Sequence, residues 1–478
     1  MNRRTKIIAT IGPASDSEEN LRHLIEAGMD VARISLAHDN LDITLERYNR
    51  VRKMAAEFDH EVGIMVDLPG PKVRAGSFPD EGVVMVVGDR IRLVPGFKAS
   101  THEVVEVGYE RLLSDIEPGD RLAFGDGVVD MEILDYDNDG LIAEITHGGK
   151  VQGRPGVHIP SDRLRIPSPT REDLRMLDAF VEADVDMVAV SMVRSAHDVR
   201  MVGTEPHPRG PLVVAKIETR AAVENLTGIL DAAGAVMVAR GDLGNECPIE
   251  DLPHLQKHII RECIAHGRPA ITATQMLESM LHSATPTRAE ATDVANAIFD
   301  GTSAVMLSGE TAIGHDPANA VATMASIAER ADTEFDYQRW AMNLADLRIE
   351  EPSNFDTDIT DTMTMATWRA ATELDASAII AITRSGFTVR AIARFRPQAQ
   401  ILGFSSDPRT IRQLTLSWGS TPILMPSAGN TSNKDMVDSA VAEARTRGLV
   451  RRGDIVAVLA GSHGQSPATD VLRVVRVP

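Results

Sequence analysis

The residues best suited to chemistry lie between positions 212 and 244 of the 478-residue chain. One apolar run leads to Lys216 and Glu218, a stretch of helical pattern follows, and a second apolar run leads to Arg240 and Asp242. Carboxylates are hard oxygen ligands that suit Mg²⁺ or Mn²⁺, and a nearby ammonium can neutralise a phosphoryl group during its transfer. The pattern therefore predicts a divalent-metal site for a phosphorylated substrate. A salt-bridge cluster without a catalytic role has the same spacing.

These charges need elements that bring them together. Continuous Val, Ile and Ala runs are typical of parallel strands buried on both faces, and the residues just past them lie at the carboxyl edge of the sheet, where α/β folds place their chemistry. Eight such runs, with helical patterns between most of them, predict a (β/α)₈ TIM barrel rather than an open doubly wound sheet. The runs are 6–11, 31–36, 63–67, 187–191, 213–217, 235–239, 269–273 and 304–307.

The barrel pattern, over residues 1–70 and 170–340, is interrupted after its third strand. Between 71 and 169 the helical period disappears, and short alternating runs separated by Gly, Asp and Pro predict an inserted small β-barrel domain. Its position in the loop after strand three would make it a lid over the carboxyl end of the barrel. Residues 341–478 begin with an acidic stretch, 343–355, that we expect to be irregular, and continue as an open-sheet α/β domain.

The composition and net charge of the chain argue against some classes of binding partner. The chain has 49 Lys and Arg against 69 Asp and Glu, a net charge of −20, which argues against a nucleic-acid or anionic-membrane partner. No apolar run approaches the roughly 18 residues that span a bilayer, and no apolar region follows the basic residues at the N-terminus. Cys247 and Cys263 have no metal-ligand spacing, as expected for free thiols. We therefore expect a cytoplasmic enzyme with a small-molecule substrate.

Further candidates follow other strands of the predicted barrel. Arg33 is expected to close the second strand and Arg74 to follow the third, which would direct two guanidinium groups at the same rim. Paired guanidiniums near a metal favour a ligand with several phosphate or carboxylate oxygens. Thr274 is expected at the end of strand seven, in a segment rich in hydroxyl groups. Taken singly, the arginines have the ordinary alternative of a surface position, and the hydroxyls that of helix capping.

Several motifs, in this order and at this spacing, resemble those of the pyruvate kinase family over nearly the whole chain. They are T-K-I-I-A-T-I-G-P-A-S (5–15), G-M-D-V-A-R (28–33), A-K-I-E (215–218), M-V-A-R-G-D-L-G (237–244), A-T-Q-M-L-E-S-M (273–280), P-T-R-A-E (286–290), D-V-A-N-A (293–297) and M-L-S-G-E-T-A (306–312).

The resemblance implies transfer of a phosphoryl group from phosphoenolpyruvate to ADP, giving pyruvate and ATP, in the last step of glycolysis. It also implies a role for each matching residue. Lys216 and Arg33 would bind the phosphoryl group, Glu218 and Asp242 would hold Mg²⁺ or Mn²⁺, and the backbone at Gly241 and Asp242, with Thr274, would hold the substrate carboxylate and enolate. Thr274 and Ser308 would belong to the proton relay, and His38 and Arg74 would face the nucleotide.

Two departures from the family pattern concern the monovalent cation. Many relatives read R-x-N-F-S-H-G where this chain reads R-I-S-L-A-H-D, so Ser35 and Ala37 replace an Asn and a Ser that bind K⁺ together with an Asp matching Asp67. Potassium-dependent relatives also carry a Glu at the position of Lys72. Our hypothesis is that the Lys72 ammonium supplies the charge that K⁺ would supply, so that K⁺ is not required. The alternative is a loop that has drifted, with weak activity.

The C-terminal region holds a candidate effector site. Residues 382–388, I-T-R-S-G-F-T, lie between a predicted strand and helix, where hydroxyls and free N–H groups bind anions. The family binds a phosphorylated effector at the equivalent loop, which implies that Thr383, Ser385, Gly386 and Thr388 hold a phosphate; a plain turn is the alternative. The resemblance also implies a homotetramer.

Two rival functions remain open at this point. A barrel lyase that handles phosphoenolpyruvate or pyruvate also uses a metal-bound Glu and Asp, but it would not need the inserted β domain or the arginines of the nucleotide side. A regulatory pseudoenzyme would bind effectors through the third domain, and the presence of Lys216, Glu218, Asp242 and Thr274 argues against it.

Overall fold

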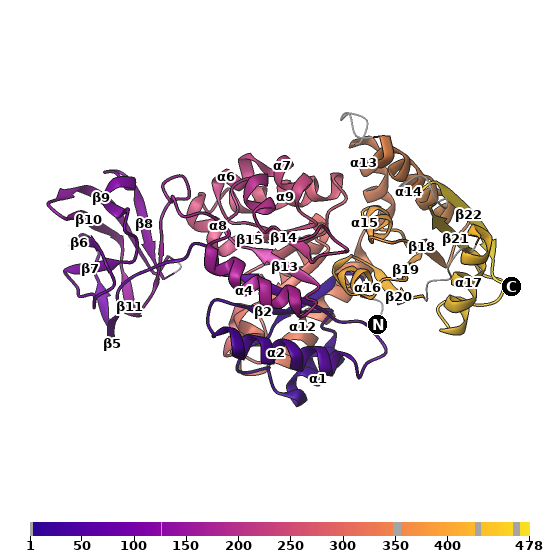
Figure 1. Cartoon of the computed structure of the whole chain (residues 1–478), viewed down its shortest axis with the longest axis horizontal. Helices are drawn as coiled ribbons and strands as arrows, with labels where there is room; N and C mark the ends of the chain where they lie inside the picture. The colour runs from indigo at the N-terminus through magenta and orange to yellow at the C-terminus, as the bar shows by residue number, and fades with distance from the viewer. Residues whose placement is uncertain (1–2, 126, 348–354, 426–431, 462–468) are drawn as a thin grey trace.

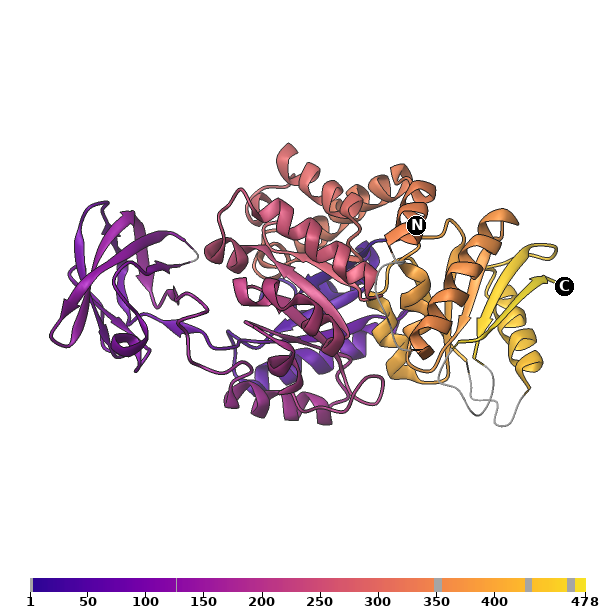
Figure 2. The ribbon, with the colours of Figure 1, turned by 90° about the horizontal axis from the view of Figure 1, so that it is seen from above.

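The computed structural model describes residues 3–125, 127–347, 355–425, 432–461 and 469–478. Three bodies follow one another along the long axis of the molecule: a β domain at one end, a barrel in the middle and an α/β domain at the other end (Figure 1). The view from above has the same order (Figure 2). The barrel therefore has a neighbouring domain on each side.

Eight parallel strands close the central barrel in the order β1-β17-β16-β15-β14-β13-β3-β2. The predicted (β/α)₈ fold is confirmed, and each predicted strand agrees with an observed one to within about one residue at either end. The strands are β1 (Lys6–Thr10), β2 (Val31–Ser35), β3 (Gly63–Leu68), β13 (Met187–Val190), β14 (Leu212–Ile217), β15 (Ala235–Ala239), β16 (Ala270–Ala273) and β17 (Ala304–Leu307).

Several of the surrounding helices begin at residues whose side chains cap them. Ser17 accepts a hydrogen bond from the Asn20 N–H at the start of α1, and Gly28 ends this helix in the left-handed conformation, with φ of 114°. The helix predicted over 220–232 is wrong in one respect, because it breaks at Asn225 into two short helices. The helices are α1 (Glu18–Ala27), α2 (Leu41–Ala55), α4 (Arg171–Glu182), α5 (Ala196–Arg200), α6 (Arg220–Glu224), α7 (Leu226–Ala232), α8 (Arg240–Glu246), α9 (Leu252–Ala265), α10 (Arg288–Asp300), α11 (Gly309–Ala312) and α12 (Pro317–Glu334).

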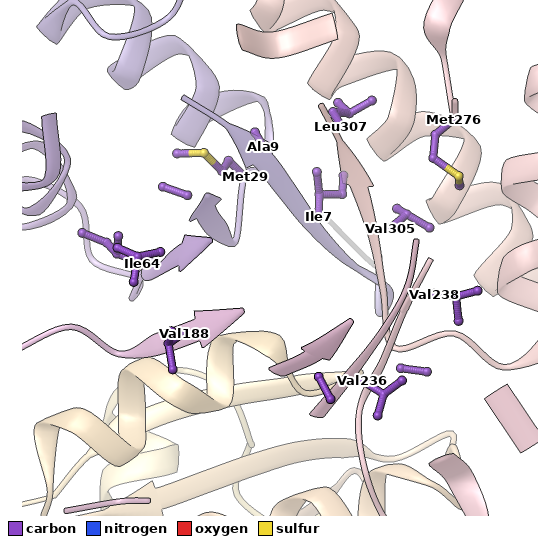
Figure 3. Packing of buried hydrophobic residues seen from close by; sticks show 14 of the residues in the cluster. Ile7, Ala9, Met29, Ile64, Val188, Val236, Val238, Met276, Val305 and Leu307 are labelled. Carbon is purple, nitrogen blue, oxygen red and sulfur yellow. The ribbon is translucent and has the colours of Figure 1, made fainter. Parts of the chain in front are cut away.

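The barrel strands bury both of their faces, in two separate apolar clusters. Outward-facing residues pack against the helices, and Figure 3 shows several of them, including Ile7, Val188 and Val305. The residues that alternate with them, such as Ile8 and Met187, fill the barrel interior. This alternation decides which side chains at a strand end reach the barrel axis and which lie against the helices.

The inserted domain is a β sheet of order β4-β12-β8-β9-β10-β6-β7, with β5 and β11 forming a separate pair. A bridge between Ala75 and Val107 joins its first and last strands, so the sheet curls into a barrel-like body. The predicted hairpin turn at 137–140 is confirmed by the pairing of Asp137 with Gly140. The elements are β4 (Val73–Arg74), β5 (Phe78–Met85), β6 (Arg90–Pro95), β7 (Val104–Val107), α3 (Leu112–Asp115), β8 (Arg121–Phe124), β9 (Val129–Asp137), β10 (Gly140–His147), β11 (Gly149–Gly153) and β12 (Gly156–His158).

The inserted domain contacts the barrel at α8. Ser161, just after β12, donates from its backbone N–H and from its hydroxyl to the two carboxylate oxygens of Glu246, at 2.9 and 2.7 Å. His158 Nε2 lies 3.2 Å from Glu246 Oε1. Burial would raise the pKa of Glu246, but the contacts with His158 and Ser161 lower it below its ordinary value. Glu246, the last residue of α8, therefore connects the inserted domain to this helix.

The C-terminal domain has a five-stranded sheet of order β20-β19-β18-β21-β22, parallel except for β22, which confirms the open-sheet α/β fold. The expectation of irregular chain over 343–355 is wrong for its first part, because α13 continues to Leu347; residues 348–354 lie outside the described residues. The elements are α13 (Tyr337–Leu347), α14 (Phe355–Glu373), β18 (Ala378–Ile382), α15 (Phe387–Ala393), β19 (Gln400–Ser405), α16 (Pro408–Gln413), the 3₁₀ turn η2 (Leu414–Leu416), β20 (Ser420–Leu424), α17 (Asn433–Thr446), β21 (Ile455–Ala460) and β22 (Val471–Arg476).

The C-terminal domain also closes the amino end of the barrel. Leu416 is fully buried within the cluster that fills the barrel interior. Arg412 Nε donates to Asp186 Oδ1 at 2.5 Å, just before β13, and Arg4 Nη1 donates to the carbonyl oxygens of Pro397 and Ala399. Because this end is covered, the carboxyl end is left for a substrate.

Candidate active site

Polar residues at the carboxyl end of the barrel continue the inward-facing rows of its strands. On β14, Leu212 and Val214 point into the barrel, and Lys216 comes two residues later, with the same parity. On five other strands, too, the residue two positions after an inward-facing apolar residue is polar. The set is Thr10, Arg33, Asp67, Ser191, Lys216 and Ser308. The period of two thus gathers a cation pair, a carboxylate and three hydroxyls at one rim.

Lys216 is the centre of this group. Its ammonium lies 2.7 Å from Glu218 Oε1 and 3.5 Å from Asp67 Oδ1, and it donates to Ser191 Oγ at 2.7 Å. Burial alone would lower its pKa, but the charges of Asp67, Glu218 and Asp242 raise the pKa above the ordinary lysine value. Lys216 is therefore a permanent cation, which suits charge neutralisation rather than proton exchange.

Glu218 lies directly after β14 and is almost completely buried. Burial and the charge of Asp242 raise its pKa to about 7, although the Lys216 ammonium and the Met192 N–H, which donates to Oε2 at 2.6 Å, act in the opposite direction. A buried carboxylate whose charge is opposed by a second carboxylate forms with it a site that a divalent cation stabilises. No group of three or more His, Cys, Asp or Glu in the described residues could enclose a metal. A pair fits Mg²⁺, which commonly takes one or two carboxylates together with waters and substrate oxygens.

Arg33 and Asp67 form a second buried pair beside Lys216. Arg33 Nε donates to Asp67 Oδ2 at 2.7 Å, and its Nη1 donates to Thr10 Oγ1 at 2.9 Å. Burial would raise the pKa of Asp67, but Arg33, Lys216 and Lys72 together lower it. Arg33 was expected to close its strand; it is instead the third of five residues in β2. Its side chain still reaches the rim because it is long and points inward.

Thr274 and Gly241 are joined across two neighbouring strand ends. The Gly241 N–H, in the first turn of α8, donates to Thr274 Oγ1 at 2.9 Å. Thr274 has φ of 68°, which is costly for a β-branched residue, and such strain persists where the surroundings enforce it. Arg240 provides this support by donating to the Thr274 carbonyl oxygen at 2.8 Å while it pairs with Asp293 at 2.6 Å. The strained backbone of Thr274 therefore gives its hydroxyl a defined position at the mouth of the barrel.

Ser308 follows β17 and is fixed by a buried carboxylate. Its N–H donates to Glu310 Oε2 at 2.7 Å, and the Leu277 N–H donates to Glu310 Oε1 at 3.0 Å. Glu310 was missed from the sequence, as was Ser191, which accepts a hydrogen bond from Lys216. The signal for Ser191 was available, because it extends the inward row of Met187 and Ala189 by one step.

The residues expected on the nucleotide side form a positive group. Burial lowers the pKa of His38, and the charges of Lys72, Arg74 and Arg33 lower it further, so these four side chains lie within electrostatic reach of one another. Arg74 belongs to β4, the first strand of the inserted domain, where its Nη1 donates to the carbonyl oxygen of Arg154 at 3.2 Å. Cations from the barrel and from the inserted domain thus lie near His38.

The predicted effector loop is largely engaged within its own domain. Thr383 Oγ1 accepts a hydrogen bond from the Gly386 N–H at 3.0 Å, and Thr388 Oγ1 shares one with Thr469 Oγ1 at 2.7 Å. The helix that follows the loop, α15, begins at Phe387, and Gly386 precedes it with φ of 76°. Thr383, Gly386 and Thr388 are buried, whereas Ser385 is partly exposed.

A closed (β/α)₈ barrel with a permanent lysine cation, two carboxylates suited to a divalent metal and an arginine at one rim defines the class of a metal-dependent phosphotransferase. Two family descriptions match the chain: "Pyruvate kinase, barrel domain" over residues 2–321 and "Pyruvate kinase, alpha/beta domain" over residues 361–475. The chain belongs to the pyruvate kinase family. It is an enzyme that acts on phosphoenolpyruvate and ADP and forms pyruvate, and this family depends on a divalent metal.

Individual pyruvate kinases are similar in sequence to this chain over almost its whole length. It is 36% identical to the pyruvate kinase of Bacillus licheniformis, over 99% of this chain and 80% of that protein. It is also 36% identical to the pyruvate kinase of Clostridium acetobutylicum, over 98% and 99% of the two chains, and 35% identical to that of Staphylococcus aureus, over 99% and 80%. Among the described residues, no helix has the length and apolar character needed to cross a membrane.

Proposed function

We propose that this chain transfers the phosphoryl group of phosphoenolpyruvate to ADP with Mg²⁺ bound at Glu218 and Asp242, in the cytoplasm and without a requirement for K⁺. The observation that carries the proposal is the contact of Lys216 with Glu218 and Asp67, at 2.7 and 3.5 Å, beside Arg33. Phosphoryl transfer needs positioning and charge neutralisation rather than covalent help, and this group of charges supplies both.

The residues of the site share the tasks of this mechanism. Lys216 and Arg33 hold the equatorial oxygens of the phosphoryl group between the leaving enolate oxygen and the attacking ADP oxygen. The bound divalent ion would neutralise phosphate and enolate charge. The N–H groups at Gly241 and Asp242, with Thr274, orient the substrate carboxylate. The enolate that remains takes a proton at carbon, which solvent water supplies and the Thr274 and Ser308 hydroxyls relay, and pyruvate leaves.

The proposal that K⁺ is not needed concerns Lys72. A K⁺ ion in this family lies near the carboxylate that Asp67 matches, and Lys72 already contributes a positive charge there, since it helps to lower the pKa of Asp67. Ala37, at a position where many relatives offer a hydroxyl, has no side-chain oxygen to give to a cation. The Lys72 ammonium, near Asp67, makes the electrostatic contribution that K⁺ makes in those relatives.

Lys72→Glu tests this substitution directly. We expect the wild-type enzyme to have the same turnover in K⁺ and in tetramethylammonium salts at equal ionic strength and saturating substrates. The variant should lose most of its activity without K⁺ and regain part of it when K⁺ is added. Lys98→Glu, an exposed change on the inserted domain, is the matched control for charge. Strong K⁺ activation of the wild-type enzyme would contradict the proposal.

The proposed effector is a phosphorylated metabolite bound at Thr383, Ser385, Gly386 and Thr388. Ser385 is the most accessible of these, so the incoming phosphate meets its hydroxyl and the N–H groups around Gly386 first. Ser385→Asp would place a like charge there and should abolish activation by sugar phosphates or nucleotide phosphates, leaving the rate without effector unchanged. A variant that responds as the wild type does would remove this loop from the proposal. The family also supports a homotetramer, which sedimentation analysis tests.

A coupled assay with lactate dehydrogenase separates the proposed activity from its two rivals. Pyruvate formation that requires phosphoenolpyruvate, ADP and Mg²⁺ together is the expected outcome. A lyase would form its product without ADP, and a regulatory pseudoenzyme would form none. The same assay with ADP and GDP in parallel measures the nucleotide preference.

A further inference from the structure

A small cavity between the amino end of the barrel and the C-terminal domain is lined by four arginines. Arg268 comes from the barrel side, just before β16, and Arg390, Arg394 and Arg396 come from α15 and the turn after it. Arg390, Arg394 and Arg396 are 3%, 6% and 2% exposed. Burying several like charges in one place is unfavourable unless each has a counter-charge.

The described part of the chain supplies few counter-charges. Arg394 pairs with Asp361 at 2.5 Å, while Arg268, Arg390 and Arg396 have no carboxylate within 4 Å among the described residues; Asp231 and Asp332 act on Arg268 and Arg396 from further away. Arg396 donates to the carbonyl oxygens of Ile298 and Thr302 instead. The titratable group that contacts Arg390 is His207, whose Nε2 accepts a hydrogen bond from Arg390 Nη2 at 3.1 Å and carries no negative charge.

Unpaired hydrogen-bond donors point to what is missing. Among the described residues, Arg390 Nε and Nη1, Arg394 Nε, Ser417 Oγ and Trp418 Nε1 are buried without a partner. All four of these residues line the same cavity. Each of these atoms bears a hydrogen that it can donate, and buried donors are almost always satisfied in native proteins. A water molecule offers few acceptor sites and needs acceptors for its own hydrogens, whereas an anion accepts from every side.

We propose that this cavity binds one small inorganic anion of the chloride class, which bridges the barrel and the C-terminal domain. The cavity has a volume of about 20 Å³, enough for one water-sized particle. A cavity of that size excludes a sugar phosphate or a nucleotide. Its ligand therefore differs from the phosphorylated effector proposed for the loop that holds Ser385. Because the lining comes from both domains, the bound anion stabilises their contact.

The test compares thermal unfolding in chloride and in gluconate at equal ionic strength and pH. The wild-type enzyme should show a Tm that rises by about 2 °C or more with chloride and saturates. Ser417→Ala removes one donor with little change in shape and should raise the half-saturating chloride concentration several-fold. Arg390→Met should abolish the response. Ser326→Ala, an exposed serine on α12, should leave it unchanged.

Bromide, which scatters anomalously, gives a second measurement. Crystals of the full-length enzyme soaked in bromide should have an anomalous peak within hydrogen-bond distance of the Arg390 guanidinium and Ser417 Oγ. Equal Tm values in chloride and gluconate, together with no bromide peak, would overturn the proposal. Stabilisation by phosphate but not by chloride or bromide would overturn the assignment to a monatomic anion.

Discussion

Replacement of Lys216 by methionine removes one charge at the centre of the site and nearly preserves the side-chain volume. The ammonium contacts Glu218, Asp67 and Ser191. No other cation in the described site lies as close to Glu218, at 2.7 Å. Loss of one preorganised group that stabilises transition-state charge typically costs about 10²–10³ in rate. Because Lys216 both holds and neutralises the phosphoryl group, we expect at least about a 10³-fold loss in kcat, or about 4 kcal/mol.

Stability should change much less than activity. Breaking a buried ion pair can cost about 3–5 kcal/mol when it strands a charge. Glu218 avoids most of this cost, because its pKa is already about 7 with Lys216 present and the carboxyl can take up a proton instead. Asp67 keeps Arg33 as its partner at 2.7 Å. We therefore expect Lys216→Met to lower the free energy of unfolding by about 1–3 kcal/mol at pH 7.

The assay is pyruvate formation coupled to lactate dehydrogenase, with circular dichroism and urea unfolding on the same samples. Lys53→Met, an exposed lysine that pairs with Glu18, is the control and should behave as the wild type. The double variant Lys216→Met, Glu218→Gln should recover stability without recovering activity. Turnover above a tenth of the wild-type value in Lys216→Met would refute the central role given to this residue.

Two further predictions concern the same rim. Because the pKa of the Glu218 carboxyl is raised to about 7, protons compete with Mg²⁺ below that pH. Mn²⁺ or Mg²⁺ affinity measured by calorimetry should fall about fivefold from pH 7 to 6 and stay nearly constant above pH 8; a flat profile would contradict the pKa. Thr274→Val removes the acceptor for the Gly241 N–H and should lower the free energy of unfolding by about 1–3 kcal/mol as well as phosphoenolpyruvate affinity, whereas Thr274→Ser should retain both.

Much of the barrel could be predicted because its signals are local. Eight buried parallel strands produce eight apolar runs, and Ser17 and Gly28 mark the ends of α1 by their own chemistry. The clustering of Lys216, Glu218 and Arg33 followed from the rule that parallel strands bring their carboxyl ends together. A stricter use of the two-residue period would also have found Ser191 and placed Asp67 at the same rim, because both continue inward-facing rows.

Other features depend on contacts between distant segments and left no local signal. The break at Asn225 occurs inside a continuous helical pattern. Residues 343–347 are helical although the stretch is acidic, because they complete α13, whose Leu344 is buried in the barrel cluster and whose Tyr337 packs against the C-terminal cluster. Glu310 binds two N–H groups from different loops, one of them from Leu277, and that pairing exists only in the folded barrel. The grouping of Arg268 with Arg390 arises in the same way.

The connection at Glu246 has a mechanical consequence. This carboxylate is held by Ser161 of the inserted domain, and it ends the same short helix that carries Asp242 one turn earlier. A rotation of the inserted domain would therefore pull on the segment that bears Asp242, one of the two carboxylates proposed to bind the metal. We expect any closure of this domain over the barrel to move Asp242 as well, because a single turn of helix links the two residues.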